Sequence, residues 1–145
     1  MRTLDLQRNR IKCQGCIALA AALQVADGME VLNLRFNEIA DAGVTALGKA
    51  LSSNHSLKEL HLGGNLVGAE GAVSLAASLV QNGTLATLNL RSNAIQDAGA
   101  VAIAQLCRRN DSMAALYLGV NGIGEEGTAA LGDALRHNAA LLKLD

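Results

Sequence analysis

The stretch LATLNLRSNAIQDAGAVAIAQL, residues 85–106, changes its hydrophobic period halfway along. Apolar and polar residues alternate around Leu88 and Leu90, which is typical of a strand with one buried face. From Gly99 onward the apolar residues recur every three or four positions, which is typical of one face of a helix. The stretch therefore predicts a strand, a turn and a helix in that order.

The same unit recurs along the whole chain at a constant spacing. Its most regular markers are an asparagine at repeat position 9 (Asn9, Asn37, Asn65, Asn93 and Asn121) and a glycine at repeat position 15 (Gly15, Gly43, Gly71, Gly99 and Gly127). Five repeats of equal length follow without a gap, over 1–28, 29–56, 57–84, 85–112 and 113–140, and a sixth opens at 141. We expect residues 1–145 to form a single repeat domain. Because neither end carries a polar capping unit, we interpret the array as a fragment of a longer one.

The repeats share their aliphatic positions. Position 4 is leucine in all six units (Leu4, Leu32, Leu60, Leu88, Leu116 and Leu144). One repeat buries too little apolar surface to offset the backbone entropy that it loses on folding, whereas stacked repeats share their buried faces. Parallel strands lie about 4.8 Å apart and packed helices about 8–10 Å apart, so the stack has to curve. The expected fold is an α/β solenoid with a parallel sheet on the concave face and helices on the convex face.

A dinucleotide-binding turn is the main alternative, because NGIGEEG at 121–127 has the spacing G-x-G-x-x-G between an expected strand and an expected helix. Gly127, however, is the recurring glycine of position 15, and Gly124 has a counterpart in Gly68. Glu125 and Glu126 stand where a pyrophosphate would bind, and their charges would repel it. We interpret the glycines as parts of a repeat turn that lets the helix approach the sheet, and we expect no cofactor.

Two further motifs are also products of the repeat. Sequons for N-glycosylation occur at Asn54, Asn82 and Asn110, each one repeat after the last, and we interpret these asparagines as left-handed caps that close each helix. Cys13 and Cys16 have the spacing of a metal-binding pair, but zinc needs about four ligands and the sequence has no second pair. We expect no metal site.

Composition excludes several classes of function. The net charge is −1, which gives no electrostatic reason to expect nucleic acid or an anionic membrane as a partner. No apolar run approaches the length of a membrane span, and the few cysteines suit a reducing cytoplasm. His55, His61 and His137 occupy different repeat positions, so they cannot gather around one nucleophile. We therefore expect a binding protein and not an enzyme.

The unit LxxLxLxxNxIxxxGxxxLxxxL, present at 85–106, resembles the leucine-rich repeat of the ribonuclease-inhibitor type over the entire chain. Details such as ALSSNHSLKELHLGGN at 50–65 look most like the repeat domains of NOD-like receptors, which are cytosolic innate-immune sensors. The resemblance implies a right-handed, horseshoe-shaped arc that binds a protein or peptide, as the sensing or autoinhibitory region of such a receptor. The alternative is a regulator of an enzyme, either a ribonuclease-inhibitor-like blocker or a Ran-type GTPase-activating protein.

Candidate binding residues follow from the predicted concave face, which exposes positions 3, 5, 7 and 8 of each repeat. Aromatic and arginine side chains dominate the energy of many protein interfaces. On this face the candidates are Arg35, Phe36, His61, Arg91 and Tyr117. Position 7 alternates between arginine and glycine, so we expect a glycine-floored groove between the arginines that takes an acidic segment of a partner. Unpaired strand edges at the two ends also suggest end-to-end association.

We predict a structural role for the asparagines of position 9. Their short amides can satisfy backbone groups where the chain leaves each strand, and unpaired buried groups would cost about 1–3 kcal/mol each. We expect Asn9, Asn37, Asn65, Asn93 and Asn121 to form a ladder along the solenoid.

Overall fold

The computed structural model describes residues 2–145, in which short strands alternate with helices from one end of the chain to the other. The strands are β1 (Thr3–Asp5), β2 (Val31–Asn33), β3 (Glu59–His61), β4 (Thr87–Asn89), β5 (Ala115–Tyr117) and β6 (Lys143–Leu144). The helices are α1 (Lys12–Val25), α2 (Asp41–Leu51), α3 (Ala69–Leu79), α4 (Gln96–Cys107) and α5 (Glu125–Leu135). Each predicted repeat therefore contributes one strand and one helix.

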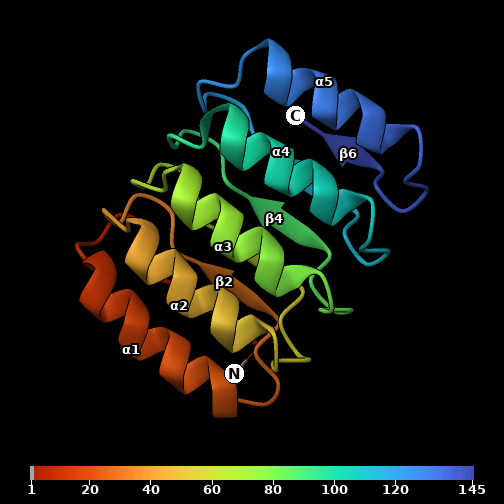
Figure 1. The fold of residues 1–145 in the computed structure, drawn as a ribbon. Helices are drawn as coiled ribbons and strands as arrows, with labels where there is room; N and C mark the ends of the chain where they lie inside the picture. The colour runs from red at the N-terminus through yellow and green to blue at the C-terminus, as the bar shows by residue number, and fades with distance from the viewer. Residues whose placement is uncertain (1) are drawn as a thin grey trace.

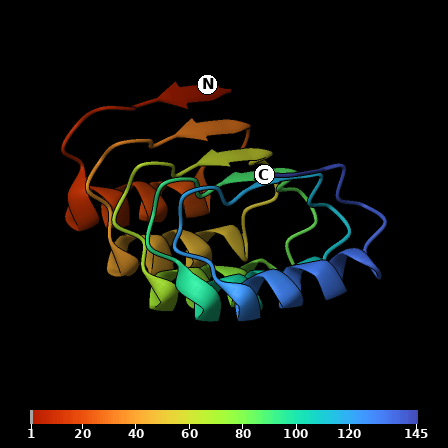
Figure 2. The same ribbon diagram turned by 90° about the horizontal axis from the view of Figure 1, so that it is seen from above.

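All six strands pair in parallel, in the order in which they occur in the chain. The register equals the repeat length, so that Leu4 pairs with Leu32 and Leu32 with Leu60. The five helices lie side by side on one face of this sheet, and the turned view separates the strand layer from the helix layer (Figures 1 and 2). The predicted α/β solenoid is confirmed.

The regular strands end at position 5, although the alternation of the sequence continues to position 7, and the chain turns away at position 8. Arg8, Phe36, Ser92 and Val120 all have φ values between 56° and 60°, in the left-handed region. Backbone pairing still continues to this point, since the Phe36 amide donates to the Gly63 carbonyl at 3.0 Å. Position 8 is therefore the start of the turn and not the last residue of a regular strand.

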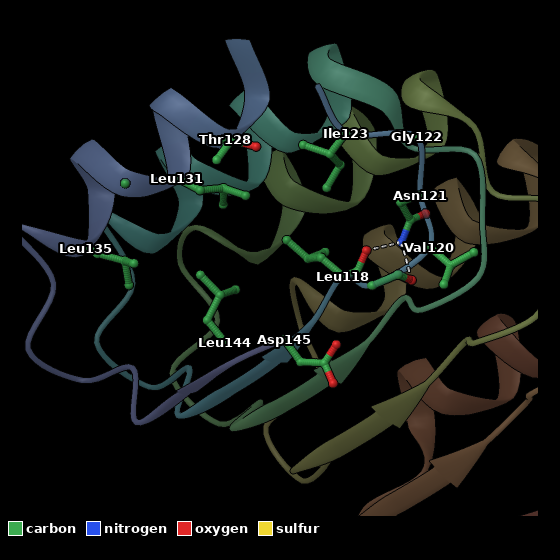
Figure 3. Close-up of a pocket in the computed structure, with 12 residues that line it drawn as sticks. Leu118, Val120, Asn121, Gly122, Ile123, Thr128, Leu131, Leu135, Leu144 and Asp145 are labelled. Atoms are coloured by element: carbon green, nitrogen blue, oxygen red, sulfur yellow. Dashed lines mark hydrogen bonds between the residues drawn. The ribbon is translucent and has the colours of Figure 1, made fainter. Parts of the chain in front are cut away.

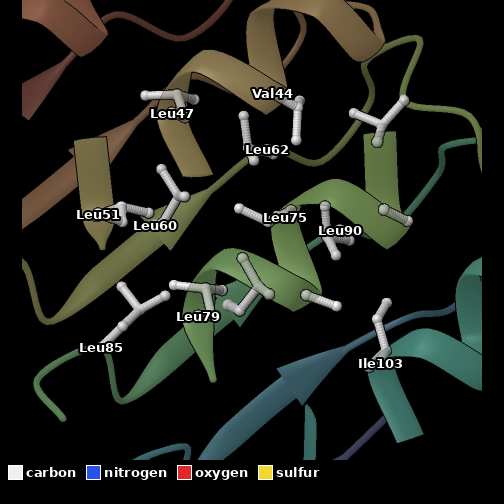
Figure 4. Packing of buried hydrophobic residues seen from close by; sticks show 14 of the residues in the cluster. Val44, Leu47, Leu51, Leu60, Leu62, Leu75, Leu79, Leu85, Leu90 and Ile103 are labelled. Atoms are coloured by element: carbon white, nitrogen blue, oxygen red, sulfur yellow. The ribbon is translucent and has the colours of Figure 1, made fainter. Parts of the chain in front are cut away.

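The core is one continuous cluster of aliphatic side chains between the sheet and the helices. Leu47, Leu51, Leu60, Leu62 and Leu75 come from neighbouring repeats, are fully or almost fully buried, and lie beside one another (Figure 4). Each repeat thus supplies side chains that cover the next, as a stacked array requires. None of the helices within residues 2–145 is long and apolar enough to cross a membrane.

The glycine of position 15 has a different neighbour from the one predicted. A Cβ on Gly43 would lie 2.8 Å from Cγ2 of Ile39 and 3.1 Å from Cβ of Cys16, which belongs to the preceding helix. The glycine therefore makes room for the β-branched side chain of position 11 and for the neighbouring helix, whereas the sequence suggested room for the sheet.

Candidate functional site

The structure groups the predicted binding residues into three separate clusters on the strand face. Arg35 and Phe36 lie together where the chain leaves β2. His61, in β3, contacts Glu59 of the same strand, with Nε2 3.3 Å from a carboxylate oxygen. Arg91 and Tyr117 contact residues at the C-terminal end of the sheet.

The first cluster is centred on Phe36, whose side chain remains 43% exposed. The guanidinium carbons of Arg35 and Arg8 lie 5.5 Å and 5.6 Å from the centre of its ring. Gly64, with φ +68°, lies against the ring, and a Cβ at Gly64 would collide with it. A half-exposed aromatic ring thus lies close to two cations, and each contact contributes about 0.5–1 kcal/mol at an exposed site.

The predicted groove between the arginines is not open, and this part of the prediction was wrong. Arg35 lies across the glycine of the next repeat, with its Nε 3.5 Å from the position of a Cβ on Gly63. Arg91 lies across Gly119 in the same way, with its Cζ 3.3 Å from that position. Because a glycine has no side chain, the arginine of the preceding repeat can lie over it and against the sheet.

The two arginines differ in their partners. Nη1 of Arg91 donates to both carboxylate oxygens of Asp145, at 3.0 Å and 2.8 Å. Arg35 has no ion-pair partner within residues 2–145, and its Nε is buried without a hydrogen bond. The Arg91 pair is about half exposed on both sides, so it contributes at most about 1 kcal/mol to stability.

Tyr117 and His61 are also engaged by neighbours on the face. Nζ of Lys143 lies 4.8 Å from the centre of the Tyr117 ring. His61 stands in register between Asn33 and Asn89.

His55 precedes β3 and His137 follows α5, so the three histidines do not meet. Over residues 2–145 no group of three His, Cys, Asp or Glu side chains gathers where it could hold a metal ion.

The asparagines of position 9 connect successive repeats. Oδ1 of Asn65 accepts the N–H groups of Asn37 and Ile39, both at 3.0 Å, and its Nδ2 donates to the carbonyls of Leu34 and Leu62 at 2.9 Å and 2.8 Å. Asn37, Asn93 and Asn121 make equivalent bonds to the preceding repeat, whereas Asn9 bonds only to its own.

The comparison with known proteins agrees with this geometry. A family profile described as "Leucine Rich repeat" matches residues 1–20, 29–48, 53–76 and 81–104, which is more than half of the chain. The chain belongs to the leucine-rich repeat family. No curated protein matches the chain in sequence.

Two solved structures share the fold of this leucine-rich repeat chain. The leiomodin-1 actin-binding site 2 superposes with a TM-score of 0.78 at 19% identity, over 94% of this chain and 80% of that one. The tropomodulin C-terminal domain from Caenorhabditis elegans superposes with a TM-score of 0.73 at 16% identity, over 94% of this chain and 83% of that one. At these identities the likeness concerns the fold alone.

A second asparagine ladder runs along the opposite edge of the leucine-rich repeats, and the sequence interpretation missed it. Nδ2 of Asn82 donates to the carbonyls of Leu51 and Asn54 at 2.7 Å and 3.1 Å, and its Oδ1 accepts the N–H groups of Thr84 and Leu85. Asn54, Asn110 and Asn138 repeat the pattern. None of the four has a positive φ, so the left-handed caps predicted at Asn54, Asn82 and Asn110 are wrong. These asparagines recur once per repeat, as those of position 9 do, and this shared period was the signal for a ladder.

Acidic residues at the helix starts of the leucine-rich repeats form another unpredicted connection. Oδ1 of Asp97 accepts the N–H groups of Gly124 and Gly127, at 2.7 Å and 3.0 Å. Asp41 accepts the N–H of Gly68 at 2.6 Å. The second repeat thus contacts the third, and the fourth contacts the fifth, through the same two side chains. These are an aspartate at the start of the helix and an arginine on the sheet.

An apolar cleft of about 570 Å³ lies at the C-terminal end, between α5 and β6. Leu131, Leu135 and Leu144 line it, and Asp145 stands at its rim (Figure 3). The end-to-end association predicted from the sequence would involve this end, and it stays a prediction.

Proposed function

We propose that the chain is a protein-binding module whose strand face takes an extended, acidic segment of a partner protein. The observation that carries this proposal is the Phe36 cluster. Its ring is half exposed, and neither adjacent guanidinium, Arg8 nor Arg35, has an ion-pair partner within residues 2–145.

The cluster has the physical properties of an interface anchor. Phe36 is held by the left-handed turn and by the contact with Gly64, so little conformational freedom is lost when a partner binds. Aromatic and arginine side chains at the centre of an interface contribute much of its binding energy. The two positive charges close to the ring favour a partner segment that carries carboxylates.

Within this class we propose the sensing or autoinhibitory repeat region of a NOD-like-receptor-type protein, because of the motif at 50–65. The alternative is a regulator of an enzyme, and assays of ribonuclease inhibition and of GTP hydrolysis by a Ran-type GTPase test it. Leiomodin-1 carries an actin-binding site on the same fold, so actin is a further defined partner to test by co-sedimentation.

Site-specific photo-crosslinking in the cells of origin tests which face binds. Phe36 on the strand face and Val73 on the helix face are replaced one at a time by a photoreactive phenylalanine, and both native side chains are 43% exposed. We expect a discrete crosslinked protein from position 36 and none from position 73. Crosslinking from position 73 alone, or from neither position, would contradict the proposal.

A further inference from the structure

Two arginine–glycine units of the same design lie on the strand face. Arg35 and Gly63 form the first unit, and Arg91 and Gly119 form the second, two repeats further along the chain. In both units the arginine lies across the glycine of the following repeat. The units are therefore internal copies of one arrangement, and they can be compared directly.

The second unit holds a carboxylate. Asp145, at position 5 two repeats beyond Arg91, receives both hydrogen bonds from the arginine Nη1. Such a charge-assisted pair is the interaction that an arginine of this face makes when a carboxylate is within reach.

The first unit has no carboxylate. Asn89 stands at position 5 two repeats beyond Arg35, and its neutral amide cannot balance a charge. The oxygen Oδ1 of Asn89 is used by another group, since it accepts the N–H of Arg91 at 3.0 Å. The nearest acidic residue on β3, Glu59, contacts His61. Arg35 therefore keeps a buried Nε without an acceptor, which is unfavourable in the isolated protein.

We propose that the Arg35 unit binds a carboxylate side chain of the partner, in the manner in which Arg91 binds Asp145. This inference rests on the proposed function and specifies its chemistry: an aspartate or glutamate contacts Arg35, and an adjoining apolar side chain contacts Phe36. Arg8, which also lies close to the ring, adds a second positive charge near the same segment.

Peptide titration followed by NMR tests the site without knowledge of the partner. The probes are the blocked peptides acetyl-Leu-Asp-Leu-amide and acetyl-Leu-Asn-Leu-amide, which differ only in the charge of the central side chain. We expect the acidic peptide to cause saturable shifts of the Arg35 Nε–H signal and of the Gly63 amide. The neutral peptide should bind about tenfold more weakly or not measurably.

Two substitutions sharpen the test. Asn89→Asp places a carboxylate where the second unit has Asp145, so it should shift the Arg35 Nε–H signal by itself and abolish binding of the acidic peptide. Arg35→Gln should also abolish binding, whereas Arg10→Gln, which removes an exposed arginine of another repeat position, should leave it intact.

Equal binding of the two peptides, or equal effects of Arg35→Gln and Arg10→Gln, would overturn the inference. If crosslinking at position 36 succeeds while the acidic peptide does not bind, the strand face is a protein-binding face without a carboxylate anchor. If the acidic peptide binds as expected and no protein crosslinks at position 36, the Arg35 unit is a carboxylate site, but the proposed function fails.

Discussion

At the scale of single residues, the asparagine of position 9 connects each repeat to the one before it. Asn65→Ala leaves two buried N–H groups without their acceptor and two carbonyls without their donor. We expect it to lower the free energy of unfolding by about 3–5 kcal/mol. Asn9→Ala is the matched control, because Asn9 is exposed and bonds only to its own repeat, and it should cost less than about 1 kcal/mol. Equal losses in urea unfolding of the two variants would contradict the inter-repeat role.

Cys16 gives the stability a dependence on alkaline pH. Burial, and to a smaller extent the neighbouring Cys13 thiol, raises the pKa of Cys16 from 9.0 to about 12. The unfolded chain therefore releases this proton from about pH 9 upward, while the folded chain retains it until about pH 12. Above about pH 9 the thiol should lower the free energy of unfolding by up to about 1.4 kcal/mol per pH unit.

Cys16→Ala isolates this contribution, because alanine already stands at the same repeat position in Ala72 and Ala100. The stability of the native chain relative to this variant should fall between about pH 9 and pH 12, as measured by denaturant unfolding at several pH values. A constant difference across that range would show that Cys16 does not titrate as described.

At the scale of elements, the turn after each strand fixes the candidate site. Gly64→Ala combines an unfavourable positive φ with a collision against the Phe36 ring. Gly122 has nearly the same φ, +67°, and a Cβ added to it would meet no atom of residues 2–145 within 4 Å, so Gly122→Ala measures the conformational cost alone. We expect about 1 kcal/mol for Gly122→Ala and about 2–3 kcal/mol for Gly64→Ala, measured by thermal and urea unfolding. Similar losses would mean that the Phe36 ring moves aside without cost.

The start of each helix is the second element with a measurable role. Asp97→Ala removes the acceptor of two N–H groups at the beginning of α5, and we expect a loss of about 1–3 kcal/mol. Glu125→Ala controls for the interaction of a first-turn acid with the helix dipole, which contributes only about 0.3–1 kcal/mol. If the two variants lose equal stability in urea, the bonds between repeats contribute nothing.

At the scale of the whole molecule, one set of side-chain contacts joins the second repeat to the third and the fourth repeat to the fifth. The second repeat reaches into the third through Arg35 and Asp41, and the fourth reaches into the fifth through Arg91 and Asp97. A period of two repeats is thus superimposed on the period of one.

Equal-length deletions test this pairing. Removing residues 57–84 joins the second repeat to the fourth, which brings Arg35 beside Arg91 and Gln96 beside Asp41. Removing residues 85–112 joins the third repeat to the fifth, where the same positions hold glycines and an alanine. Because like charges on neighbouring strands repel, we expect the first deletion to be less stable by about 1–2 kcal/mol in urea unfolding. Equal stability of the two deletion variants would show that the two-repeat period contributes nothing to the free energy of unfolding.

The sequence was sufficient for the architecture because the fold depends on properties that repeat. The leucines of position 4 and the asparagines of position 9 predicted the sheet register and the site of the turn. The side-chain arrangement at the candidate site was not predictable in the same way. Whether Arg35 spans Gly63 or leaves it open depends on rotamers and on neighbours in the next repeat, which no period encodes. The alternation of arginine and glycine was visible, but its meaning required the structure.

The buried asparagines of the second ladder have a consequence for where the chain can fold. Asn54, Asn82 and Asn110 are 1–4% exposed, and each amide nitrogen donates to backbone carbonyls of the preceding repeat. N-glycosylation of any of them during translocation would attach a bulky, hydrophilic oligosaccharide to that nitrogen. The neighbouring repeats leave no room for an oligosaccharide there. The repeats of a chain glycosylated at these sites could not pack against one another, so glycosylation there is incompatible with the native fold.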